Sequence, residues 1–122
     1  MPLGALTATY SSLSVSQHRI RITANNIANV NTDGFKKSQT VLSTVQPHGV
    51  KGEVEQVETA GPSALEQTAQ GEQSIERSNV DIGVEMVNLL SDQRGYKASL
   101  RTLKSANEMV GILLDVVADE KQ

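Results

Sequence analysis

The sequence has no cysteine and no tryptophan, and its aromatic residues are Phe35, Tyr10 and Tyr96. The lack of cysteine excludes disulfides, thiol catalysis and cysteine metal sites, and it leaves both cytoplasm and periplasm open as the compartment. With so few aromatic rings, a core has to be built from Leu, Ile, Val, Met and Ala. Such a composition favours helix-on-helix packing over a sheet sandwich.

Charge of one sign and long apolar runs are also scarce. The formal net charge is −3, and the basic residues are dispersed among the acidic ones, so we expect no nucleic-acid partner. No stretch approaches the roughly 20 apolar residues of a membrane span, so direct membrane insertion is not expected. The N-terminus lacks a basic region and an uninterrupted apolar run. It is therefore not expected to act as a cleavable signal peptide, and export would need another route.

Catalytic and metal-binding motifs are missing from the sequence. His18 and His48 have no neighbouring metal-ligand spacing. Residues 29–34 begin like a calcium-binding loop, but Thr40 stands where such a loop needs a bidentate Glu. No nucleophile elbow or glycine-rich phosphate loop is found. We therefore expect no catalytic residue, no metal, no cofactor and no enzymatic activity.

Apolar residues recur at alternating spacings of three and four near both ends of the chain, which predicts two helices with heptad seams. The first row consists of Leu3, Leu6, Tyr10, Leu13, Gln17, Ile20, Ala24 and Ile27. The second row consists of Ile82, Met86, Leu89, Gln93, Tyr96, Leu100, Leu103, Asn107, Val110, Leu114 and Val117. We call these two rows the predicted seam and expect them to serve helix packing and assembly. Its polar members Gln17, Gln93 and Asn107 share one heptad position, where such side chains can fix register.

The region between the rows has a different character. It contains Pro47 and Pro62, and the runs 39–45 and 50–59 could pair as a hairpin. The sequence predicts three parts: 1–35, an N-terminal heptad helix with an Asn-rich end; 36–78, a β-strand and loop insert; and 79–122, a C-terminal heptad helix. Ser78 followed by Asp81 resembles a capping box at the start of the second helix. The expected fold class is mainly α, with two long terminal helices in an antiparallel coiled-coil hairpin and a small β/loop insert.

The first predicted helix is poor in charge outside its apolar row. Arg19 and Arg21 are its charged residues, and most other positions are Ser, Thr or Asn. A water-facing helix usually carries Glu, Lys, Gln and Arg, which have higher helix propensity and form stabilising pairs. A lone two-helix hairpin would also bury too little to offset its ordering entropy. We therefore expect neighbouring subunits to supply the missing burial.

Residues 24–36, which read Ala-Asn-Asn-Ile-Ala-Asn-Val-Asn-Thr-Asp-Gly-Phe-Lys, resemble the N-terminal signature of the flagellar rod, hook and hook-filament-junction proteins. Residues 79–81, 85–90, 93–96 and 106–109 resemble the C-terminal helix of the same family. The residues that we assign to the family motif are Asn25, Asn26, Asn29, Asn31, Gly34, Phe35, Asn79, Asp81 and Arg94. Segment 49–54 resembles the proximal rod proteins of the C type, whereas 31–36 is closer to the distal-rod and hook style, so the proximal rod is preferred.

The resemblance implies a structural subunit of the bacterial flagellar basal-body rod, not an enzyme. The implied partners are copies of itself and other rod proteins, joined into a torque-transmitting helical tube around the export channel. Export by the flagellar type III apparatus into the periplasm is also implied. Heptads alone would equally suit a helical adaptor or chaperone-like coiled coil. The Asn-rich motif and its counterpart at 79–81 favour the rod, and we expect the Asn side chains to bond backbone groups where the first helix ends.

Overall fold

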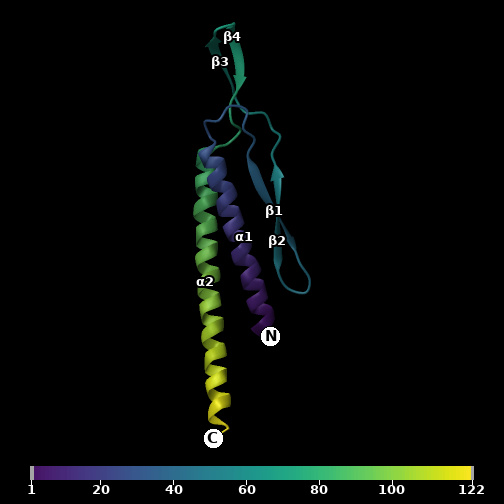
Figure 1. Cartoon of the computed structure of the whole chain (residues 1–122), viewed down its shortest axis with the longest axis vertical. Helices are drawn as coiled ribbons and strands as arrows, with labels where there is room; N and C mark the ends of the chain where they lie inside the picture. Colours follow the sequence, from purple (N-terminus) through teal and green to yellow (C-terminus); the bar gives the residue numbers. More distant parts are fainter. Residues whose placement is uncertain (1, 122) are drawn as a thin grey trace.

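The computed structural model describes residues 2–121 and has one long helix at each end of the chain (Figure 1). Its elements are α1 (Pro2–Ala28), β1 (Ser38–Thr44), β2 (Val50–Gln56), β3 (Ser63–Thr68), β4 (Gly71–Glu76) and α2 (Ile82–Asp119). The helices lie side by side and antiparallel, and the molecule is elongated along them. Asp81 caps α2, because its carboxylate accepts hydrogen bonds from the amides of Gly83 and Val84.

The prediction of a mainly α fold with a small β/loop insert was wrong. Residues 38–76 form two separate antiparallel hairpins, β1–β2 and β3–β4, so the chain combines a helix pair with two small sheets. The second hairpin was missed because the sequence of β3 is polar and lacks the alternation of a half-buried strand. Its pairing depends on a tight turn after Thr68 that ends at Gly71, whose φ of 111° favours glycine.

The hairpin β1–β2 packs along α1 (Figure 1). The Val50 amide donates a hydrogen bond of 3.1 Å to the Ser11 hydroxyl, which joins β2 to the helix. A side chain at Gly52 would come within 2.7 Å of Thr40 Cγ2 and 3.7 Å of Val15 Cγ2. Glycine at this position therefore allows the strands and the helix to approach closely, and Val15 is buried beneath them.

The hairpin β3–β4 projects beyond the helix pair and contacts neither helix within residues 2–121 (Figure 1). Ion pairs hold the base of this hairpin in place. The Arg77 guanidinium binds Asp33 at 2.5 Å and also pairs with Glu66, while Lys36 pairs with Glu76. The Gly34 amide donates to the Glu76 carbonyl oxygen at 2.9 Å. The hairpin is thus attached at one end and exposed along the rest of its length.

Few apolar side chains are buried. Among the side chains that the structure describes, Leu13 and Val15 are the buried apolar ones, at 9% exposure each. The buried polar side chains are more numerous, and they are Thr9, Thr23, Asn26, Ser78, Glu85 and Asp92. A fold with this distribution gains little from the hydrophobic effect within one chain.

Candidate assembly surface

The contact between α1 and α2 contains a row of polar and charged residues. Three side-chain pairs define it: Asn26 Nδ2 to Glu85 Oε2 at 3.3 Å, Arg19 Nε to Asp92 Oδ1 at 3.0 Å, and Ser12 Oγ to Ser99 Oγ at 3.3 Å. Positions 26, 19 and 12 on α1 thus face positions 85, 92 and 99 on α2, so both helices advance by one heptad per pair. We call these six residues the contact row.

The predicted seam lies beside the contact row. Its buried or half-buried members are Leu6, Leu13, Ile20, Ile27, Leu89, Tyr96, Leu103 and Val110. Its exposed members are Leu3, Tyr10, Gln17, Ala24, Ile82, Met86, Gln93, Leu100, Asn107, Leu114 and Val117. Gln17 and Tyr96 do meet across the helices, with 3.3 Å between Nε2 and the phenol oxygen. Polar side chains therefore occupy the centre of the helix contact, and much of the apolar row remains on the surface.

The C-terminal end of α2 extends past α1. Continuing the register of the contact row places Pro2 opposite about Met109, so residues 110–119 have no helix beside them, and Figure 1 shows this overhang. At 1.5 Å per residue the overhang is roughly 15 Å long. Its large apolar side chains are between 50% and 65% exposed, and they are Ile112, Leu113, Leu114, Val116 and Val117. The overhang is an apolar surface without a partner in the described chain.

The opposite end of the helix pair is a buried polar junction, in which Asn26 is central. Asn26 is 1% exposed, and its amide forms two hydrogen bonds with the backbone of Ser38, at 3.0 Å to the Ser38 amide and 2.8 Å to its carbonyl oxygen. Its amide nitrogen also lies 3.3 Å from Glu85 Oε2. One side chain therefore joins α1, β1 and α2.

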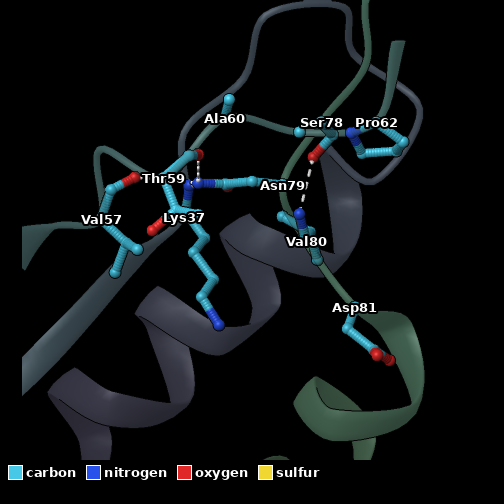
Figure 2. Close-up of a pocket in the computed structure, with 10 residues that line it drawn as sticks. Lys37, Val57, Thr59, Ala60, Pro62, Ser78, Asn79, Val80 and Asp81 are labelled. Carbon is cyan, nitrogen blue, oxygen red and sulfur yellow. Dashed lines mark hydrogen bonds between the residues drawn. The ribbon is translucent and has the colours of Figure 1, made fainter. Parts of the chain in front are cut away.

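Asn79 has a similar role just before α2, and Figure 2 shows its side chain pointing toward Lys37 and Thr59 at the pocket there. Its Oδ1 accepts from the Lys37 amide at 2.7 Å, and its Nδ2 donates to the carbonyl oxygens of Val57 and Thr59 at 2.8 and 2.9 Å. The Asn79 amide donates to the Phe35 carbonyl oxygen at 3.2 Å. Asn79 thus connects the segments that enter and leave the β1–β2 hairpin.

Of the other family-motif residues, Asn29, Asn31 and Gly34 follow the end of α1, and Arg94 lies on the middle of α2. Asn29 Nδ2 donates to the Asn25 carbonyl oxygen at 2.8 Å, and the Asn29 backbone amide donates to the same oxygen at 3.2 Å. Gly34 has a φ of 70°, a conformation that favours glycine. Asn31 is exposed nearby. Arg94 is exposed on the middle of α2, and the structure does not bring it to the junction.

Sequence reasoning missed the charged residues of the helix contact. Glu85 is 4% exposed beside Asn26, and its Oε1 lies 3.9 Å from Lys37 Nζ. Asp92 is 7% exposed beside Arg19, and its burial raises its pKa, an effect that the Arg19 charge partly opposes. The spacing of seven residues between these two acids, matched by Arg19 and Asn26 on α1, is the signal that could have identified the contact row.

The described residues show no grouping suited to metal binding or membrane crossing. No three His, Asp or Glu side chains converge in residues 2–121 as metal ligands would. Within the same range, neither helix combines the length and apolar character that crossing a membrane requires.

Comparison with known proteins gives matches at both ends of the chain. Residues 5–36 match the flagella basal body rod protein family, and residues 72–116 match the C-terminal region of the flagellar basal body rod FlgEFG proteins. The flagellar basal-body rod protein FlgG of Buchnera aphidicola subsp. Baizongia pistaciae is 36% identical over 64 residues, which cover 51% of this chain and 25% of that relative. The two family matches contain most of both helices, together with Asn26 and Asn79, whereas β1, β2 and β3 lie outside them.

Proposed function

Because the chain belongs to the flagellar basal-body rod protein family, we propose that it is a structural subunit of the bacterial flagellar rod. In this role it assembles with copies of itself and other axial proteins into a helical tube that transmits torque and surrounds the export channel. The family is structural and not a class of enzymes. The proposal places the protein in the periplasm-spanning rod after export by the flagellar type III apparatus.

The observation that carries this proposal is that the helix pair buries polar side chains between its helices and exposes apolar side chains to solvent. The contact row consists of polar and charged side chains, whereas apolar side chains such as Leu3, Met86 and Leu114 are 58% to 80% exposed. Soluble monomers rarely leave large contiguous apolar patches in water. Helices with this pattern gain their hydrophobic stabilisation when other subunits cover the exposed row and the overhang.

Within the rod, we further propose that the chain is a proximal rod protein of the C type. Its support is the segment Gly49–Val54, which resembles the corresponding segment of those proteins and forms the start of β2. This segment packs on α1 through Val50 and Gly52.

The test is a charge placed in the overhang. Leu114→Glu puts a carboxylate on the exposed apolar row, and Ser91→Glu adds the same charge at an exposed position of α2 outside the overhang as the matched control. In a deletion strain, we expect the control to restore motility and complete rods and Leu114→Glu to restore neither. Circular dichroism of the purified variants should be equal to that of the unmodified chain. Motility with normal rods from Leu114→Glu would contradict the proposal.

A further inference from the structure

The exposed apolar side chains of α2 gather at its two ends. One group lies on one side of the first turns and consists of Ile82, Met86 and Leu90, which are spaced by four residues. We call it the start row. The other group consists of Met109 and, in the overhang, Ile112 and Val116, which are spaced by three and four residues, and we call it the end row. All six side chains are between 47% and 64% exposed.

Between the two rows the surface of α2 is polar. Residues 91–108 carry one exposed large apolar side chain, Leu100, and four exposed cations, which are Arg94, Lys97, Arg101 and Lys104. An apolar row that packed on this segment would take charged groups out of water without pairing them. The exposed apolar side chains of α1, Leu3 and Tyr10, are two turns apart and form no continuous row. The surface that suits each row is therefore the other row on a second copy.

The start row is held in a fixed position and remains uncovered. Asp81 caps α2 just before this row, and Glu85 joins the same turns to Asn26 of α1. Neither hairpin packs against α2 within residues 2–121. The end of the molecule that its own hydrogen bonds complete thus offers a preformed apolar surface to the overhang of another copy.

We propose that the end row of one copy packs on the start row of a second copy, which lies parallel to the first and is displaced by four heptads along α2. This pairing rests on the proposed rod function and names one contact within it. Ile112 then lies between Ile82 and Met86 of the second copy. Val116 lies between Met86 and Leu90 of that copy. The displacement is roughly 42 Å, at 1.5 Å per residue.

This displacement allows the contact to repeat from copy to copy. A helix of 38 residues that is displaced by four heptads overlaps its neighbour by ten residues, which is the length of the overhang. A third copy, displaced by eight heptads, lies beyond the end of the first α2 and does not overlap it. Because the two rows are at opposite ends of α2, one copy uses both at once. The contact is therefore heterologous and propagates.

The β3–β4 hairpin supports the same displacement. It projects beyond the start of α2 (Figure 1), and strands of six residues are roughly 20 Å long. In the staggered pair the hairpin of the second copy therefore extends along the first copy past Arg101, which lies three turns before Ile112 on the same side of α2. Residues 63–76 contain three Glu and no basic residue, and Glu72, beside the turn, is exposed. The hairpin and the cations of α2 thus have opposite charge.

An antiparallel pair of α2 helices would also join the two rows. It would place Met86 of each copy beside Ile112 of the other and would close as a dimer. The same pairing puts Arg94 level with Lys104 and Lys97 level with Arg101, so the cations of the two copies would face each other. The parallel, displaced arrangement keeps these cations apart.

The contact is small for a single pair of copies. An overlap of ten residues on each helix buries less than the roughly 1,200 Å² of a stable interface. It therefore depends on the other contacts of the assembled rod, and its test belongs in cells that build rods.

The absence of native cysteine allows a test by oxidative cross-linking in such cells. A full-length variant with both Met86→Cys and Val116→Cys is expressed in a deletion strain. The proposal predicts a ladder of covalent dimers, trimers and higher oligomers, because each copy is linked at both ends of α2. The matched control keeps Val116→Cys and replaces Met86→Cys with Asn88→Cys, an exposed site two residues further and about 200° around the helix. It should give little product.

A buried charge tests the cause of the ladder. Adding Ile112→Glu to the double-cysteine variant should lower the cross-linked product about tenfold, because a carboxylate would have to enter between Ile82 and Met86. A product that stops at the dimer indicates the antiparallel pair and overturns the proposal. Equal products from the Asn88→Cys control, a ladder unaffected by Ile112→Glu, or no product at all also overturn it. If cells with complete rods give any of these results, the contact between the two rows fails while the rod function stands.

Discussion

The two ends of the helix pair differ in how many of their side chains find partners within the same chain. At the junction end, Asn26, Glu85 and Asn79 are joined to both helices and to the β1–β2 hairpin by hydrogen bonds. At the opposite end, residues 110–119 of α2 expose a group of large apolar side chains. The difference teaches that folding and assembly depend on opposite ends of the helix pair. Polar groups fix the shape of the chain where it is closed, and apolar groups remain free where other subunits are needed.

The largest expected effect is the loss of the junction through Asn26→Leu. This substitution removes three hydrogen bonds and leaves the Ser38 backbone and the Glu85 carboxylate without that partner in a buried place. We expect the free energy of unfolding to fall by about 3 kcal/mol. Thermal unfolding followed by circular dichroism measures it. Asn25→Leu, on the exposed side of the same turn, should change stability by less than about 0.5 kcal/mol and serves as the control. Equal stability of both variants would remove the contrast between the two ends.

A smaller effect is expected from Asn79→Ala, which breaks three side-chain hydrogen bonds that are partly open to water. We expect a loss of about 1–2 kcal/mol, concentrated in the β1–β2 hairpin and not in the helix pair. Amide hydrogen exchange should become faster in β1 and β2 and at Val57, whose amide donates to the Lys37 carbonyl oxygen just past β2, and should stay unchanged near Ser12 and Ser99. Uniform loss of protection along the chain would show that the junction and the helix contact are one cooperative unit.

The smallest effect concerns Asp92, midway between the ends. Because burial raises its folded-state pKa above the unfolded value, its contribution to stability is fully present below the unfolded pKa of about 3.8 and is lost as pH rises through the folded pKa. Asp92→Asn removes this dependence. The stability of the variant relative to the unmodified chain should therefore rise from acid to neutral pH. Denaturant unfolding at several pH values measures the difference. A relative stability that falls over this range would mean that attraction to Arg19 outweighs burial.

Sequence reasoning predicted the hairpin partners in β1 and β2 and a cap at the start of α2, because both depend on local chemistry. The cap is Asp81, three residues after the Ser78 that a capping box would use. Asp81 supplies the carboxylate that free helix amides need, and the strands follow apolar runs near a turn. The sequence did not identify the centre of the helix contact. Heptad counting assumes that the most apolar row is buried within the chain, but here Ser12 and Ser99 meet and Leu100 is exposed. The β3–β4 hairpin escaped prediction because its strands are polar and its base depends on ion pairs between residues distant in sequence, such as Arg77 and Asp33.

The attachment of β3–β4 has a mechanical consequence. A hairpin that is held at its base and touches no helix within residues 2–121 acts as a lever arm. A sideways force on its tip reaches the rest of the molecule through Arg77, Lys36 and the backbone pairing of Gly34 with Glu76. These contacts lie next to the segment that leads into the Asn79 junction. Load applied at the exposed tip is therefore delivered to the end of the helix pair that the chain has bonded most completely.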